Sequence, residues 1–453
     1  MKNSYLIKSA IIAALGGLLF GFDTAVISGT TEALENVYGL SKMSLGFTVA
    51  MALIGTIIGA MFSAKPADIY GRKNTLFIIG ALYFISAIGS GLAWDWYSFL
   101  FFRLIGGLGV GAASVVSPLY IAEISPANMR GRLVAVTQFN IVLGVLMAFA
   151  SNYIISGLDL GAVEWRWMFG VEAIPAVLFF ILLFLTPYSP RWLVRQNRIE
   201  EASATLKKLG MDDQAALEHV EEIQQSFDLE HHTLKESIFQ KAYIKPVLLV
   251  IAISMFNQLS GINAIMYYAP MIFKMAGSGT ESALLQTVAV GVVNLFFTML
   301  AMTLIDRFGR RTLMFVGSFG YIISLSVVAW AFFTYGADFA AGNPNDGGMI
   351  VLISLGVFIA SHAFGQGAVI WVFLSEIFPN RVRASGHAFG CFVHWFMAAA
   401  VSWSFPVIAS ISGAYTFAFY AAMMVFQLIW VIKVMPETKG VTLEGIQKKL
   451  GIA

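Results

Sequence analysis

Charged residues are scarce in this chain: Asp, Glu, Lys and Arg make up 12% of its 453 residues, whereas hydrophobic residues make up 58%. A soluble domain carries about a quarter of its residues as charges. The polar surface is therefore too small to cover a water-exposed globule, and we expect lipid to cover most of the folded protein. A net charge of +2 is also too small to indicate a nucleic-acid partner.

Cysteine is nearly absent as well. The single Cys391 lies in an apolar stretch, so an intrachain disulfide is impossible and we interpret it as a packing residue. No cleavable signal peptide is evident, because the first apolar run, residues 7–27, is too long for the apolar part of a signal and contains Asp23. We expect this run to be the first membrane span.

Twelve apolar runs are long enough to cross a bilayer as helices, which takes about 20 residues each. They form two sets of six, separated by a polar segment. The runs lie near 7–29, 43–65, 74–92, 98–121, 132–157, 166–187, 243–273, 282–305, 311–335, 348–375, 385–410 and 414–435. We predict an all-α membrane protein with six-helix bundles at 1–187 and 243–436 and a cytoplasmic tail at 437–453.

Positive charge predicts the orientation. If both termini are cytoplasmic, all but four of the 28 lysines and arginines lie in or beside cytoplasmic segments, as the positive-inside rule requires. The exceptions are Lys42, Arg103, Arg166 and Lys274. Between the bundles, residues 188–242 combine charge with apolar residues at helical spacing. This pattern favours short amphipathic cytoplasmic helices over the alternative, a flexible linker.

Three motifs occur twice in the same order, once in each half. The pairs are Asp68-Ile-Tyr-Gly-Arg72-Lys with Asp306-Arg307-Phe-Gly-Arg310-Arg, Glu123-Ile-Ser-Pro with Glu376-Ile-Phe-Pro, and Pro187-Tyr-Ser-Pro-Arg with Pro436-Glu-Thr-Lys. Such a duplication is typical of transporters that bind their substrate between two bundles near the middle of the membrane.

The duplicated motifs are also candidates for a gate. We predict that their carboxylates and guanidiniums pair across helix ends when the cytoplasmic side is shut, and separate when the site faces inward. This cytoplasmic latch comprises Asp68, Arg72, Glu123, Arg130, Asp306, Arg307, Arg310, Glu376 and Arg383. The alternative is that the arginines only set the topology, which leaves the paired acidic residues unexplained.

With these pairs, further motifs resemble the sugar porter family of the major facilitator superfamily over nearly the whole chain. They are Gly21-Phe-Asp23 through Gly29, Arg103 with its following glycines, Pro118-Leu-Tyr-Ile-Ala-Glu123, Trp165-Arg-Trp-Met-Phe169, Pro190-Arg-Trp-Leu193, Gln258-Leu-Ser-Gly-Ile-Asn263 and Tyr267-Tyr-Ala-Pro270. Because of Asp23, the likeness is greatest to the bacterial xylose–proton symporters. The resemblance implies the twelve-helix major facilitator fold, alternating access, and Gln138, Gln258 and Asn263 as sugar ligands.

Three ionisable residues lie inside predicted spans, namely Asp23, Arg103 and Glu172. Each costs about 2.5–3.5 kcal/mol to insert, so we expect them to serve function. Our hypothesis is that Asp23 takes up a proton and releases Arg103, which couples transport to protons. Glu172 either supports this switch or has a structural role. The alternative for the pair is a purely structural ion pair.

Small residues predict how Asp23 and Arg103 come together. Gly17 and Gly21 lie one turn apart in span one, and Gly107 and Gly111 follow Arg103 at intervals of four in span four. Faces of this kind let helix backbones approach closely. We therefore expect these two faces to bring the acidic residue of span one to Arg103.

A sugar hydroxyl both donates and accepts hydrogen bonds, so its site needs amide side chains, and aromatic faces cover its C–H surface. The candidates in predicted spans are Gln138, Asn257, Gln258, Asn263, Tyr267, Asn294, Gln366, Trp371, His394 and Trp395. For Asn294 the alternative is an interhelical hydrogen bond. For His394 we favour a neutral hydrogen-bonding ring over one that titrates during transport.

Several positions depart from the family pattern. Asn257, Gln366, Ala368 and His394 stand in place of a glutamine, a tryptophan, a proline and a glutamine, while Ile69 and Tyr188 stand in place of an arginine and a glutamate. The pocket changes leave the sugar open. Exchanging a stacking tryptophan for an amide favours a more polar or larger ligand, such as a hexose or a cyclitol.

We therefore predict a monomeric symporter that imports a monosaccharide with protons across a bacterial inner membrane, surrounded by lipid and without cofactor or metal. One alternative is a facilitative uniporter with the same pocket. Another is a membrane sugar sensor, which the short tail disfavours. An enzyme is disfavoured because paired carboxylates at enzyme spacing, metal-ligand clusters and nucleophile motifs are missing.

Overall fold

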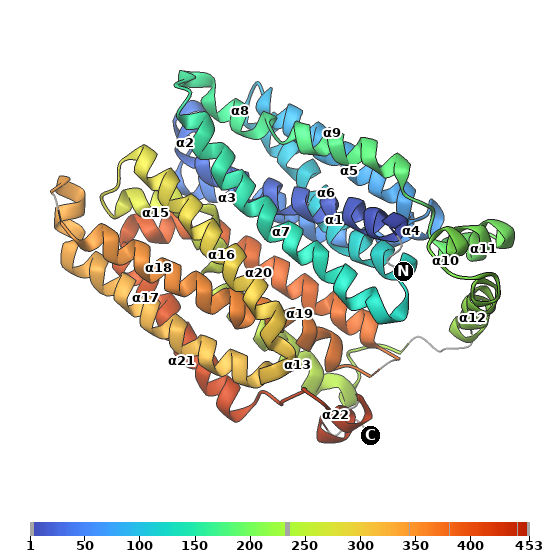
Figure 1. Ribbon diagram of the computed structural model, residues 1–453. Helices are drawn as coiled ribbons and strands as arrows, with labels where there is room; N and C mark the ends of the chain where they lie inside the picture. Colours follow the sequence, from blue (N-terminus) through green and yellow to red (C-terminus); the bar gives the residue numbers. More distant parts are fainter. Residues whose placement is uncertain (1–3, 232–235, 344, 380, 442, 451–453) are drawn as a thin grey trace. The chain divides into compact units, whose positions relative to one another are not determined.

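The computed structural model describes residues 4–231, 236–343, 345–379, 381–441 and 443–450, with side chains except at 127–128, 228–231, 306, 443–444, 447 and 449. Every regular element in these ranges is helical (Figure 1). Those of the first half and the linker are α1 (Ser4–Val26), η1 (Ile27–Gly29), α2 (Thr31–Tyr38), α3 (Lys42–Phe62), α4 (Ala64–Ile69), α5 (Arg72–Gly91), α6 (Trp96–Ile124), α7 (Ala127–Ser156), η2 (Gly161–Val163), α8 (Glu164–Gly170), α9 (Ala173–Leu182), η3 (Leu183–Leu185), α10 (Pro190–Arg195), α11 (Ile199–Lys208) and α12 (Asp213–His231).

The second half repeats this pattern of long apolar helices joined by short turns. Its elements are η4 (Lys241–Tyr243), α13 (Ile244–Leu259), α14 (Ile262–Tyr267), α15 (Ala269–Met275), α16 (Thr280–Phe308), α17 (Arg310–Ala341), α18 (Gly347–Phe364), α19 (Gln366–Glu376), α20 (Arg383–Ile411), α21 (Gly413–Lys433) and α22 (Leu443–Leu450).

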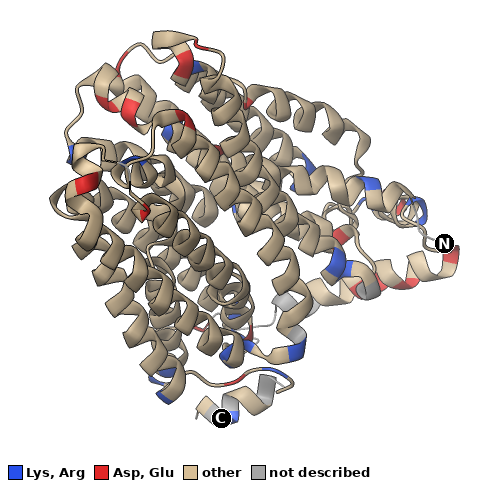
Figure 2. Cartoon of the chain, turned by 60° about the vertical axis from the view of Figure 1, so that its left-hand side comes forward, with Lys and Arg blue, Asp and Glu red and all other residues tan. Residues whose placement is uncertain are grey.

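Helices that can cross a membrane dominate the structure. Within the described ranges, 12 helical segments are long and apolar enough to do so, and each overlaps one predicted run. Figure 2 shows why lipid suits them: the long helices carry little charge along their length, and charged residues gather near helix ends and on the linker helices. The all-α fold and the number of spans are confirmed.

Backbone contacts group the chain into two compact units. The first contains Met1–Thr24, Ile54–Ala148 and Arg166–Leu234, and the second contains Ala25–Leu53, Phe149–Trp165 and Lys235–Ala453. The second unit thus includes two segments of the first sequence half, because η1 packs against α14 and α15. The bundle boundaries at 187 and 243 follow the sequence repeat and stay a prediction.

The core of the first unit joins α1, α5, α6 and α9. Its buried side chains include Leu19, Tyr83, Val116 and Phe179. A capping box starts α6: the Asp95 carboxylate accepts the backbone N–H of Ser98 at 2.7 Å, and the Ser98 hydroxyl returns to the Asp95 backbone. Such caps satisfy amides that a helix leaves unpaired at its N-terminus.

The linker forms three helices, α10, α11 and α12, rather than an extended chain. Their apolar faces pack against one another through a small core that includes Trp192, Leu206 and Val220. Figure 1 shows them as a separate group of short helices. The amphipathic pattern of this segment therefore reflects a core of its own.

The core of the second unit joins α13, α17, α19, α20 and the tail. Val250, Leu313, Phe373 and Leu374 are among its buried side chains. The tail helix α22 was not predicted, yet its Ile446 belongs to this core, and Figure 1 shows it near the start of α13. The tail is thus anchored on the unit by apolar contacts.

Candidate functional site

Asp23 and Arg103 form an ion pair inside the first unit. Asp23 lies in the last turn of α1 and Arg103 lies in α6, and their side chains are 0% and 2% exposed. Arg103 Nη1 donates to Asp23 Oδ1 at 2.9 Å, and Nη2 donates to the Asp23 backbone carbonyl at 2.9 Å. The structure thus brings these two predicted residues together, and their role in coupling stays a prediction.

A second carboxyl group adjoins this pair. Glu172, between α8 and α9, is 0% exposed and interacts electrostatically with both Asp23 and Arg103. Neither Glu172 oxygen, nor Asp23 Oδ2, accepts a hydrogen bond from a donor in the described part of the chain. Two carboxyl groups thus lie near one guanidinium that bonds to Asp23, and a proton on either carboxyl group would supply a donor between them.

Tyr83 lies near both carboxyl groups, and it was not among the predicted site residues. It lies on α5, its hydroxyl is buried without a hydrogen-bond partner among the described residues, and it interacts electrostatically with Asp23 and Glu172. A tyrosine inside an apolar run gives no signal by itself, because the run is equally compatible with a packing residue.

Our prediction that the glycine faces of spans one and four bring Asp23 to Arg103 is wrong. Gly17 and Gly21 pack against α7 and Gly111 packs against α3, since a Cβ at each position would meet backbone atoms of that helix. The glycine beside the ion pair is Gly106, where a Cβ would lie 2.8 Å from Asp23 Oδ1. The small residues let α1 and α6 approach other neighbours, and Gly106 alone leaves space for the carboxylate.

Four predicted sugar ligands of the second half form one hydrogen-bonded cluster. Asn257 and Gln258 on α13 are 2% and 1% exposed. Gln258 Nε2 donates to Asn257 Oδ1 at 3.0 Å and lies 3.3 Å from His394 Nε2 on α20. Asn263 Nδ2, on α14, donates to Gln258 Oε1 at 2.9 Å. Amide and imidazole groups from three helices thus face one another.

Aromatic rings surround this cluster. The Trp371 ring of α19 lies 4.9 Å from the His394 ring, and the Trp395 ring lies 5.0 Å from it at a nearly perpendicular angle. Tyr267 ends α14 and is 6% exposed. Polar groups with flat apolar faces beside them match the needs of a sugar, whose hydroxyls and C–H surface require both.

The helix that carries the amides is broken. Gly261 separates α13 from α14 with φ +85°, and a Cβ there would lie 2.6 Å from the Tyr420 ring of α21. Irregular backbone at membrane depth is tolerated where protein buries it or where it lines a cavity. Discontinuous helices of this kind form the binding sites of many secondary transporters.

Two predicted ligands of the second unit form hydrogen bonds outside this cluster, and a third belongs to the first unit. Gln366 is 0% exposed, and its amide bonds to Gln427 of α21. Asn294 on α16 is half-buried and accepts a long hydrogen bond of 3.5 Å from Thr298, one turn away. Gln138 on α7 is half-buried in the first unit. The sequence contained one signal for this bond, since Gln427 is a second glutamine inside a predicted span, the twelfth.

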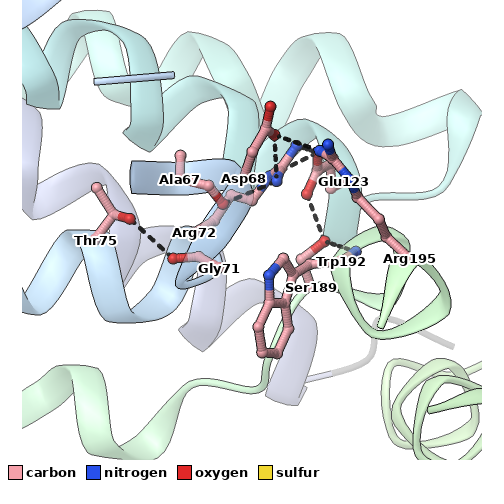
Figure 3. Close-up of polar contacts among 9 residues, drawn as sticks. All are labelled: Ala67, Asp68, Gly71, Arg72, Thr75, Glu123, Ser189, Trp192 and Arg195. Carbon is pink, nitrogen blue, oxygen red and sulfur yellow. Dashed lines mark hydrogen bonds and ion pairs between the residues drawn. The ribbon is translucent and has the colours of Figure 1, made fainter. Parts of the chain in front are cut away.

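The first copy of the charged motif forms a compact network (Figure 3). Arg72 donates to Asp68 Oδ1 at 3.0 Å and, through Nε, to Glu123 Oε1 at 3.0 Å. The other Glu123 oxygen accepts from Ser189, just before α10. Arg195 of α10 pairs with Asp68 at 3.0 Å. The ends of α4, α5 and α6 are thus tied to the linker.

The second copy repeats this arrangement within the second unit. Arg310 Nη2 donates to Glu376 Oε1 at 2.9 Å, and Thr438 Oγ1 donates to Glu376 Oε2 at 2.6 Å. Gly309 has φ +87°, close to the +88° of Gly71 at the matching turn. Positive φ of this kind favours glycine, which explains why the motif contains it.

The two copies differ in what holds the helix that follows the glycine. In the second, the Glu437 carboxylate accepts the backbone N–H groups of Arg310 and Arg311 at 3.1 Å and 3.0 Å. An anion at a helix N-terminus is favoured by the unpaired amides and the helix dipole. The residue thus acts as a cap for α17.

In the first copy aromatic rings take this place. Tyr188 stacks on Trp192 with ring centroids 5.5 Å apart. Lys73 lies 5.2 Å above the Tyr188 ring, and Arg198 lies 5.7 Å from the same ring. A Cβ at Gly71 would lie 2.9 Å from the Trp192 ring. Cation–π contacts therefore replace the carboxylate contacts of the other half.

The remaining latch candidates are less connected. Arg130 donates from Nε to the Ala122 carbonyl at 3.1 Å. Arg383 is half-buried, and its Nε and Nη2 find no hydrogen-bond partner among the described residues. Arg307 is exposed, and the side chain of Asp306 lies outside the described residues.

A further ion pair lies within the second unit. Lys274 of α15, an exception to the predicted charge distribution, pairs with Glu32 of α2. Nearby, Asn152 Nδ2 donates to the Val26 carbonyl at 3.0 Å, where α1 gives way to η1. The end of span one is thus attached to the second piece of the broken span seven.

Comparison with known proteins identifies the family. The family described as Sugar (and other) transporter matches residues 9–450. The chain belongs to this family. The structure of the xylose transporter XylE from Escherichia coli in an inward-open conformation matches it with a TM-score of 0.86 at 37% identity, covering 98% of this chain and 99% of that one. The protein therefore has the major facilitator fold and is a sugar transporter rather than an enzyme.

Its curated relatives transport different sugars. The D-xylose-proton symporter of Escherichia coli K12 is 38% identical, over 98% of this chain and 96% of the relative. The glucose transport protein of Synechocystis is 37% identical over 96% and 95%. The arabinose-proton symporter of Bacillus subtilis is 34% identical over 98% and 95%. Sugar transport is common to all three, whereas the sugar differs.

Proposed function

We propose that this protein is a proton-coupled symporter that imports a monosaccharide, a pentose, hexose or cyclitol, by alternating access. Its setting is a bacterial inner membrane with both termini cytoplasmic. The observation that carries the proposal is that two buried carboxyl groups, Asp23 and Glu172, lie near the guanidinium of Arg103, which pairs with Asp23. Protons are the second substrate of this carrier.

The charges of this cluster favour proton uptake. With both carboxyl groups ionised, one negative charge is left uncompensated inside a membrane protein, where unpaired charge is costly. One proton removes that charge and also provides the hydrogen bond that Glu172 and Asp23 Oδ2 otherwise lack. Protonation then weakens the bond between the Asp23 carboxyl group and Arg103, which lowers the cost of moving α1 relative to α6.

The sugar is proposed to bind at the cluster of Gln258, Asn263 and His394, with Trp371 beside it. Gln138 and Asn257 are retained as ligands from the family pattern. The Gln366 amide bonds to Gln427 on another helix. We therefore no longer propose that Gln366 contributes a polar contact to the sugar. Loss of the indole at that position still leaves room for a ligand larger than a pentose.

The charged motifs are proposed to act as the cytoplasmic latch. Each network ties three helix ends together through one arginine and one glutamate, Arg72 with Glu123 and Arg310 with Glu376. Helices held in this way move as a group. When the site opens inward, we expect these bonds to rearrange.

Uptake into proteoliposomes tests the proposal. Purified protein is reconstituted, and accumulation of radiolabelled xylose, arabinose, glucose, galactose and myo-inositol is measured with and without an acid-outside pH gradient. A symporter concentrates its sugar only with the gradient and alkalinises a weakly buffered medium when sugar is added. Equal final sugar concentrations on both sides under the gradient would identify a uniporter, and absence of transport for a bound sugar would favour a sensor.

A further inference from the structure

Buried hydrogen bonds link helices α17, α19 and α21 of the second unit. Gln366 and Gln427 are both 0% exposed, as is Ser318. Gln366 Nε2 donates to Gln427 Oε1, and Gln427 Nε2 donates to Ser318 Oγ at 2.9 Å. Tyr321 continues the chain, with its hydroxyl 3.5 Å from Gln366 Oε1 and 2.7 Å from His362 Nδ1.

Breaking one hydrogen bond of this chain costs free energy, because it leaves a buried polar group without a partner. An amide deprived of its partner at membrane depth carries the full cost of its lost hydration. Each glutamine here meets that need only through the other helices, since its bonds run to α17, α19 or α21 rather than to its own helix. The side chains therefore fix the contact between these three helices in one arrangement.

The helix that bears Gln366 packs into the core of the second unit through Phe373 and Leu374, and the glutamine bonds add a polar restraint at its N-terminal end. It starts directly after Gly365, whose dihedral angles of −92° and −101° interrupt α18, and it contains 11 residues. Gln366 and Trp371 are five positions apart, which places them about 140° apart around the helix axis. One side of α19 thus bonds to Gln427, while another carries the indole beside His394.

We propose that Gln427 and Ser318 are positioning residues that, through Gln366, fix the rotation of α19 and thereby direct Trp371 at the sugar. This inference rests on the proposed sugar site. It assigns Gln366 to helix positioning rather than to sugar contact. It also gives span twelve a part in sugar selectivity without a contact to the sugar.

Paired substitutions test the inference. Gln427→Met and Gln366→Met keep side-chain length but remove the amide. Each is expected to raise the KM of the best sugar by about five- to ten-fold, the equivalent of one lost hydrogen bond, with little change in maximal rate. Discrimination among the sugar panel should weaken in parallel. Because both variants break the same bond, the double variant should raise KM no further than either single one.

Thr416→Val is the matched control. Thr416 lies on α21 as well and is buried, but its hydroxyl bonds to the Ser412 carbonyl one turn away rather than to another helix. Its KM and selectivity should equal those of the wild type. Ser318→Ala is a milder change that should also raise KM. It tests the inference if the methionine variants do not accumulate in the membrane.

Two results would overturn the inference. One is an unchanged KM and selectivity in Gln427→Met or Ser318→Ala. The other is a double variant whose KM shift is the product of the single shifts, because independent effects would show that the residues do not act through one another. If instead the wild type binds none of the sugars, the proposed function fails, which is a different outcome from a binding wild type with unaltered variants.

Discussion

Arg103 holds Asp23 at two points, the carboxylate and the backbone carbonyl, each at 2.9 Å. Protonation of the carboxyl group weakens the first bond but leaves the second, because a carbonyl does not titrate. The arginine therefore stays beside α1 after proton uptake. Only the strength of the contact changes, which suits a reversible switch.

Asp23→Asn is expected to uncouple transport from protons. The amide keeps the size of the side chain and mimics its neutral form, so proton-driven accumulation should fall to equilibrium while sugar exchange persists. One charge moved across 100 mV is worth about 2.3 kcal/mol, which sustains roughly forty-fold accumulation in the wild type. Both quantities are measured in proteoliposomes, as gradient-driven uptake and as counterflow.

Glu281→Gln is the control for this change, since Glu281 is an exposed acidic residue in the first turn of α16. It should accumulate sugar like the wild type. Accumulation by Asp23→Asn at the wild-type level would show that the ion pair is structural and that Asp23 does not couple transport to protons.

Gly261→Ala is expected to impair transport through the broken span seven. The new Cβ meets the Tyr420 ring at 2.6 Å, and φ of +85° is unfavourable for alanine, costing about 1–2 kcal/mol for the backbone alone. If this strain falls on the state that binds sugar, initial sugar uptake should fall about five- to thirty-fold. Gly336→Ala, on α17 with no atom within 4 Å of its Cβ, should have little effect. Normal uptake by Gly261→Ala would show that the turn adapts easily.

Loss of Arg72 or Arg310, the arginines of the two charged motifs, should destabilise the protein unequally. Arg72 and Glu123 have side chains 8% and 7% exposed, whereas Arg310 and Glu376 are 11% and 24% exposed. Removing one partner of a buried pair costs about 3–5 kcal/mol, and solvent reduces that cost. Arg72→Ala should therefore lower the melting temperature in detergent more than Arg310→Ala. The reverse order would show that the linker contacts of the first copy compensate.

The ion pair between Glu32 and Lys274 should bias the carrier toward the state in which it forms. It is partly exposed, so breaking it is worth about 0.2–1 kcal/mol, at most roughly a five-fold change in population. Lys274→Glu should change the ratio of sugar exchange to net uptake, and adding Glu32→Lys should restore it. If the double variant stays as altered as the single one, the pair does not control opening.

The sequence was sufficient for the spans, the linker helices and the repeat. Spans follow from apolar length, and the motif pairs follow from direct comparison of the halves. Asp23 and Arg103 could be paired because they are rare charges in apolar runs. The glycine stripes pointed to the wrong partners, since a small residue shows that some helix approaches closely but not which one.

The amide cluster was partly foreseeable for a related reason. Gln258 and Asn263 lie close together in one broken helix, so their proximity is local. The direction of the Gln366 side chain could not be predicted, because it depends on Gln427, which lies 61 positions away on another helix. Side-chain partners across helices are set by rotation and depth, and neither can be derived from periodicity alone.

The exchange of Glu437 for Tyr188 between the repeats has a consequence for ionic strength. Carboxylate contacts at the start of α17 weaken as salt screens them, whereas beside α5 the stack of Tyr188 on Trp192 remains when salt weakens the cation–π contacts. Concentrated salt should thus loosen the base of one repeat before the other. The two copies of the motif should therefore respond differently to the ionic strength of the same medium.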